Sequence, residues 1–151
     1  MANPPTVLIL SKDAVLRDLL CELLSCQRFE VVGAGDIEEA GVLCRSHRPG
    51  AILLDAVEDS DLAFALLDDP WTPLGDVQPA IVLLAGSGTD AEVREHGYVD
   101  RVLGAPFDTE LVAEALRYHA SGRARREMRS GVQLRAAVAQ TFARKRRAQG
   151  E

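Results

Sequence analysis

Several of the residues best suited to chemistry stand directly after short apolar runs. Asp55 follows one such run, and Ser11, Lys12 and Asp13 follow another. Asp13 and Asp55 are the candidate ligands for a metal ion. Two carboxylates alone are a poor cage for magnesium, which prefers near-octahedral coordination by oxygen ligands, so we expect no resident cofactor.

Other kinds of reactive site lack the residues that they need. No nucleophile elbow Gly-x-Ser-x-Gly occurs, and neither of the Gly-x-Gly turns continues into a nucleotide-binding motif. The histidines and cysteines show no metal-ligand spacing; they are His47, His96, His119, Cys21, Cys26 and Cys44. We expect the cysteines to be reduced, buried or half-buried thiols, with zinc binding as the alternative. We also expect the chain not to be an enzyme.

Strand-like and helix-like patterns alternate along the chain. Short apolar runs, typical of strands buried on both faces, occur at 7–10, 29–32, 51–54, 80–85 and 101–103. Helical spacing of apolar residues occurs at 13–26, 36–44, 60–67 and 109–119, and aspartates stand where helices would begin. The alternation predicts an α/β, doubly wound fold with a five-stranded parallel sheet flanked by five helices.

In a doubly wound sheet, ligands bind beyond the carboxyl ends of the strands. The residues at those predicted positions are Ser11, Lys12, Asp13, Asp55, 84–88 and Ala105. A long loop is expected at 68–79, where Trp71 would be either a packed lid over the neighbouring helix or an anchor for a partner.

The distribution of charge suggests two parts. Residues 1–120 carry 8 basic and 21 acidic side chains, whereas residues 121–151 carry 9 basic and 2 acidic ones. We therefore predict a folded domain at 1–120 and a basic, helical tail at 121–151. No apolar run approaches the ~20 residues that cross a bilayer, and residues 1–6 lack a secretory pattern, so we expect a cytoplasmic protein.

The tail has three competing uses. An apolar stripe that includes Phe142 would dock a protein partner, which we favour, or a second copy of the chain in a homodimer. The cations of 123–147 would alternatively bind nucleic acid or an anionic membrane.

Four segments together resemble the receiver domain of response regulators, over about residues 5–120. They are Leu8-Ile9-Leu10-Ser11-Lys12-Asp13, Ile52-Leu53-Leu54-Asp55, 79–85 and Ala105-Pro106-Phe107. The resemblance implies the strand order 2-1-3-4-5 and an aspartate, here Asp55, that accepts phosphate from a histidine kinase. It also implies a peptide bond before Pro106 that is often cis.

The same resemblance indicates that the phosphorylation site is degenerate. The family's acidic pair corresponds to Ser11 and Lys12, its hydroxyl residue to Leu84, and its lysine to Ala105. Its aromatic switch residue corresponds to Val102. Without these groups the charge of a transferring phosphoryl group is poorly stabilised, so we expect Asp55 to be vestigial. Lys12 would either pair with Asp55 or point to solvent.

The resulting hypothesis is a pseudo-receiver that binds protein partners independently of phosphorylation. The family's usual binding face, formed by helix 4, strand 5 and helix 5, would present Arg101, Leu103, Leu111 and Tyr118. The alternatives are a response regulator that is still phosphorylated at Asp55, and a nucleic-acid-associated regulator that uses the tail.

Overall fold

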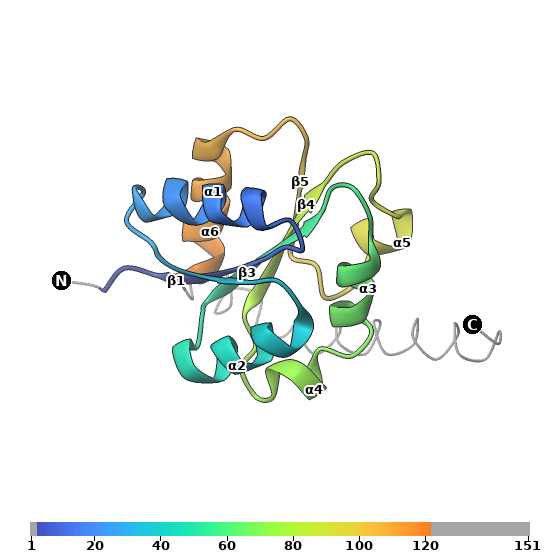
Figure 1. The fold of residues 1–151 in the computed structure, drawn as a ribbon, viewed down its shortest axis with the longest axis horizontal. Helices are drawn as coiled ribbons and strands as arrows, with labels where there is room; N and C mark the ends of the chain where they lie inside the picture. Colours follow the sequence, from blue (N-terminus) through green and yellow to red (C-terminus); the bar gives the residue numbers. More distant parts are fainter. Residues whose placement is uncertain (1–2, 122–151) are drawn as a thin grey trace.

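The computed structural model describes residues 3–121, which form a single parallel sheet between two layers of helices (Figure 1). The strands are β1 (Thr6–Leu10), β2 (Glu30–Ala34), β3 (Ala51–Ala56), β4 (Ala80–Ala85) and β5 (Arg101–Gly104). They pair in the order β2-β1-β3-β4-β5, all parallel. The predicted doubly wound fold and its strand order are confirmed.

Within residues 3–121 there are six helices, of which the first five lie between strands and the last follows β5. They are α1 (Ala14–Ser25), α2 (Ile37–His47), α3 (Asp61–Leu67), α4 (Trp71–Leu74), α5 (Ala91–Arg94) and α6 (Thr109–Ala120). The prediction of five helices and a long loop at 68–79 is therefore wrong by one short helix, α4. Pro70 and Pro73 favour the first turn of a helix, where proline needs no amide partner, but Gly75 ends it after four residues.

Aspartates start four of these helices, as the sequence predicts. Asp13, Asp36, Asp90 and Asp108 each accept hydrogen bonds from backbone amides of the first helical turn. A carboxylate at this position satisfies amides that have no partner inside the helix.

The core lies on both faces of the sheet. The aliphatic strand residues alternate between the two faces: one set packs against α2, α3 and Val93 of α5, and the other against α1 and α6. The three central strands have almost no exposed side chains, as expected for strands covered on both sides.

Two expectations concern single side chains. Trp71 packs edge-on against Tyr98, with 6.2 Å between the ring centroids, and stays 40% exposed, so its role as a partner anchor stays a prediction. Cys44 is buried and Cys21 half-buried, but Cys26 is exposed, which corrects the expectation of three buried or half-buried thiols. Cys26 is the C-cap residue of α1, at the surface of the protein.

Candidate functional site

The sheet brings four of the predicted site residues together at the carboxyl ends of its strands, which we call the carboxyl edge. Ser11 follows β1, Asp55 is the last residue but one of β3, and Leu84 is its direct neighbour on β4. Ala105 follows β5, and its amide bonds to the carbonyl of Ala85 at 2.9 Å. Because the strands are parallel, residues from all four meet at their carboxyl ends, as predicted.

Asp55 is held by two hydrogen bonds. The hydroxyl of the fully buried Ser11 donates to Oδ2 of Asp55 at 2.8 Å, and the Val57 amide donates to Oδ1 at 3.1 Å. The Ser11 hydroxyl oxygen also accepts the Asp13 amide at 3.1 Å. Both carboxylate oxygens of Asp55 thus have donors supplied by the chain itself.

Lys12 does not form an ion pair with Asp55. Its ammonium lies 3.1 Å from a carboxylate oxygen of Asp59 and 3.9 Å from one of Asp61. Since Ser11 points into the protein, its neighbour Lys12 points outward, where the chain after β3 presents these two acids. The hydrogen bond from Lys12 lowers the pKa of Asp59 below its ordinary value. The predicted pair with Asp55 is therefore wrong, whereas the alternative, that Lys12 points to solvent, agrees with a side chain that is 50% exposed.

Leu84 and Ala105, the two other predicted site residues at the ends of the strands, have aliphatic side chains. Leu84 is 1% exposed and packs in the core layer under α1 and α6. Ala105 is exposed and offers only a methyl group, and the peptide bond between it and Pro106 is cis. Neither residue can donate a hydrogen bond from its side chain toward Asp55.

Two hydroxyl residues near this edge were missed by the sequence analysis. Thr89 donates to the carbonyl of Ala56 at 2.5 Å, and Ser60 accepts the Asp90 amide at 2.7 Å. Together they tie the loop after β4 to the loop after β3. The available signals were the position of Thr89 beside Gly88 and that of Ser60 just before α3, but hydroxyl residues at such positions are too common to single them out.

The residues at this edge do not fit a magnesium ion. Asp13 uses Oδ1 to cap α1, accepting the amides of Val15 and Leu16 at 3.0 and 3.1 Å. Asp55 accepts the two hydrogen bonds described above, and neither Ser11 nor Lys12 carries a carboxylate. Within residues 3–121 no cluster of three or more histidine, cysteine or acidic side chains could hold a metal ion. Asp13 and Asp55 alone are therefore a poor cage for magnesium, which prefers near-octahedral coordination by oxygen ligands.

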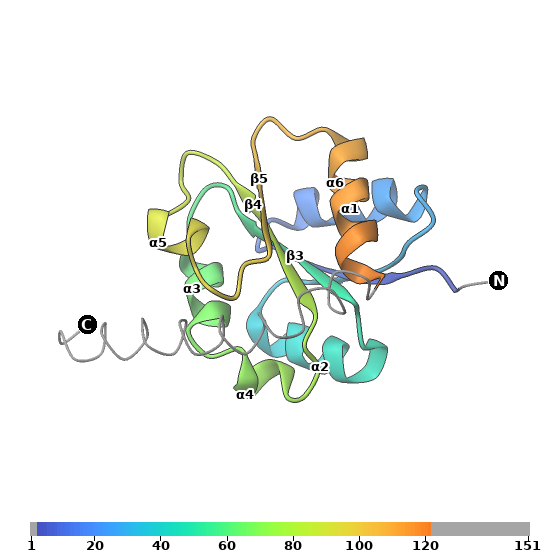
Figure 2. The same cartoon turned by 180° about the vertical axis from the view of Figure 1, so that it is seen from behind.

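The second candidate region surrounds β5, the edge strand between α5 and α6 (Figure 2). Val102 is 37% exposed and Leu111 is 57% exposed. The guanidinium of Arg101 lies 6.0 Å from the centre of the Tyr118 ring, and Leu103 packs toward the core under α6. Alternate residues of a strand point to opposite faces, so Val102 lies on the α5 side and the others on the α6 side.

The last predicted interaction residue, Phe142, lies outside the described residues, as does the whole segment 122–151. The predicted uses of the basic tail therefore stay predictions. Within residues 3–121, no helix is both long and apolar enough to cross a membrane.

Comparison with solved structures identifies the fold. The receiver domain of a LuxO repressor protein from Vibrio parahaemolyticus superposes with a TM-score of 0.65 at 16% identity, covering 82% of this chain and 95% of that one. A CheY-like receiver domain from Methanospirillum hungatei gives 0.60 at 28% identity, covering 78% and 94%. The fold is that of a receiver domain.

A third neighbour extends the same result. The receiver domain of an HD domain-containing protein from Pseudomonas fluorescens gives a TM-score of 0.67 at 22% identity, over 84% of this chain and 95% of that one. No family model and no curated protein matches the sequence. This chain thus shares the receiver fold with these three structures at sequence identities of 16–28%.

Proposed function

We propose that this chain is a receiver-type signalling protein that binds a protein partner without needing phosphorylation of Asp55, and that it is not an enzyme. The observation that carries the proposal is the surroundings of Asp55. Its carboxylate is held by Ser11 and by the Val57 amide, while Leu84 and Ala105 supply only aliphatic groups.

Phosphoryl transfer to an aspartate requires cations and donors that are already directed at the transferring oxygens. Lys12 directly follows Ser11 in the sequence. Its ammonium group is paired with Asp59 at the surface. Removing one such electrostatic group typically slows an enzyme by about 10²-fold or more, and here several are replaced together. These replacements support a protein that has the receiver fold but no longer transfers a phosphoryl group to Asp55.

The binding face would be the region around β5. α5 has only four residues, which leaves Val102 partly uncovered at the sheet edge. On the other side of the strand, Leu111 and the Arg101–Tyr118 pair add apolar and aromatic surface. Partly exposed aromatic and arginine side chains are enriched among the residues that dominate binding energy at protein interfaces.

The phosphorylation part is tested by amide NMR of the full chain titrated with magnesium and beryllofluoride, a phosphoryl mimic. We expect no saturable shifts at Asp55 or its neighbours, and the same spectra for Asp55→Asn. Saturable shifts that spread to Val102 and Leu111 and vanish in Asp55→Asn would instead establish a phosphorylated response regulator.

The binding part is tested with matched surface variants. Val102→Asp and Leu111→Glu should weaken self-association in sedimentation experiments, or binding of a partner recovered by crosslinking, by about tenfold or more. Val42→Glu, at a 54% exposed position on α2, is the control and should bind as the wild type does. Equal binding by all three variants would exclude the β5 face.

A further inference from the structure

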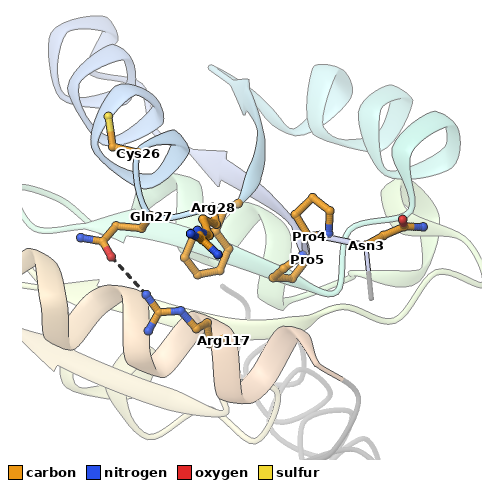
Figure 3. Close-up of a pocket in the computed structure, with 8 residues that line it drawn as sticks. Asn3, Pro4, Pro5, Cys26, Gln27, Arg28 and Arg117 are labelled. Carbon is orange, nitrogen blue, oxygen red and sulfur yellow. Dashed lines mark hydrogen bonds between the residues drawn. The ribbon is translucent and has the colours of Figure 1, made fainter. Parts of the chain in front are cut away.

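A pocket with two arginines lies at the amino-terminal ends of β1 and β2, whereas Asp55 lies near the carboxyl end of β3. Figure 3 shows the residues that line this pocket. Three segments form it: residues 3–5 before β1, the turn 26–29 between α1 and β2, and Arg117 on α6. Its volume is about 700 Å³, within the range of about 300–1,000 Å³ that is usual for small-molecule sites. None of the residues proposed above for function contributes to it.

Arg117 is held in place before any ligand binds. One guanidinium nitrogen donates to Oε1 of Gln27 at 3.1 Å, and the guanidinium carbon lies 5.7 Å from the centre of the Phe29 ring. Figure 3 shows the side chain reaching from α6 toward Gln27. A guanidinium carries five N–H donors in a fixed plane, so those not used by Gln27 are available to a ligand.

Arg28 occupies a backbone position that favours glycine. Its φ is 69°, and the bonds from Arg28 N to Ser25 O and from Phe29 N to Leu24 O form the motif that commonly ends helices with glycine. Arg48, at the end of α2, has a similar left-handed backbone. A positive charge near a helix C-terminus is stabilised by the helix dipole, and this explanation applies to Arg28 and Arg48 alike. What distinguishes Arg28 is that it lines a pocket with a second arginine.

Neither arginine is neutralised by an acid. Within residues 3–121 the salt bridges are those of Lys12, and no carboxylate oxygen lies within 4.0 Å of Arg28 or Arg117. This is notable because residues 1–120 carry 21 acidic and only 8 basic side chains. Two unpaired guanidinium groups in one pocket of an acidic domain form a local site for an anion.

We propose that this pocket binds a small organic phosphate. A phosphate monoester carries close to two negative charges near neutral pH, which matches two guanidinium groups. The rings of Pro4 and Pro5 would contact the organic part of the ligand, and the amides of Gln27 and Asn3 would offer hydrogen bonds to it. The site does not depend on Asp55, so it can be tested separately from the function proposed above.

The test uses AMP as the probe and amide NMR of the full chain as the readout. AMP should shift the resonances of Gln27, Phe29 and Arg117 saturably, whereas adenosine, which lacks the phosphate, should not. Arg28→Gly and Arg117→Gln should each weaken AMP binding by about tenfold or more, as expected for loss of a charged hydrogen bond. Arg28→Gly also relieves the left-handed backbone, so lost binding in that variant cannot be attributed to misfolding.

Arg48→Gly is the matched control, because it removes an arginine from an equivalent backbone position outside the pocket. It should leave AMP binding unchanged. The proposal is overturned if AMP at concentrations up to about 10 mM gives no saturable shifts, because even a site with a millimolar Kd would be occupied there. It is equally overturned if the Arg28 and Arg117 variants bind AMP as the wild type does, or if succinate binds as tightly as AMP.

Discussion

The Ser11 hydroxyl donates a 2.8 Å hydrogen bond to Oδ2 of Asp55 and so links the end of β1 to the end of β3. Ser11 is fully buried and its partner is a carboxylate, a combination worth more than an ordinary hydrogen bond. Ser11→Ala should therefore lower the free energy of unfolding by about 1.5–3 kcal/mol, measured by urea denaturation.

The exposed Ser25 provides the control for this prediction. Its hydroxyl bonds to the Cys21 carbonyl within α1, so Ser25→Ala should change stability by less than about 0.5 kcal/mol. If the two variants were equally stable, the Ser11–Asp55 bond would have no special role in holding the strands.

The pKa of Asp59 should respond to Lys12. The hydrogen bond from Lys12 holds this pKa below its ordinary value, so Lys12→Ala should raise it and Lys12→Arg should keep it low, measured by NMR of the side-chain carboxyl carbon. Because the folded-state pKa is lowered, any stabilisation is present above the ordinary carboxylate pKa and is lost as the pH falls through the lowered value. Both side chains are about half exposed, so water and salt should keep the effect on stability small.

The three thiols should differ in their rates of alkylation. Burial raises the pKa of Cys44 to about 11 and also raises that of Cys21, whereas Cys26 is exposed. The thiolate is the reactive form, so iodoacetamide at mildly alkaline pH should modify Cys26 first and Cys44 last. Mass spectrometry of digests gives the order, and unfolding in urea should make the three rates similar. Rapid modification of native Cys44 would contradict its buried position.

Gly88 should tolerate no side chain. A Cβ atom at this position would lie 1.9 Å from the Glu58 carbonyl oxygen, whereas one at Gly104 would meet nothing within 4 Å. Gly88→Ala should destabilise the protein by about 1–3 kcal/mol, because the loops after β3 and β4 must separate. Gly104→Ala should be neutral or slightly stabilising, since alanine loses less conformational entropy on folding. Urea denaturation of the two variants compares them directly.

Much of the fold was predictable because local signals agreed with it. The buried runs such as 51–54 and 80–85 became the central strands, and the aspartates before the helices became their caps. The short helix α4 was missed because its prolines and Gly75 are also typical of a loop. A segment of four residues is too short for its apolar spacing to distinguish a helix from a loop.

The site residues were predictable by position but not by contact. Ser11, Asp55, Leu84 and Ala105 come together because the strands that they follow or end are parallel, which the alternating pattern predicts. That Lys12 would bind Asp59 could not be predicted, because a flexible side chain pairs with whichever acid the surrounding loops bring near it.

The alternating framework, the residue types that follow the strands and the acidic character of residues 1–120 can all be predicted from the sequence. Which donors bind the Asp55 carboxylate, and that Arg28 and Arg117, 89 residues apart, line one pocket, became known from the folded arrangement. Apolar periodicity is local and repeats along the chain, whereas a hydrogen bond or a pocket depends on the distances between segments remote in sequence. Those distances are set by the packing of the whole domain.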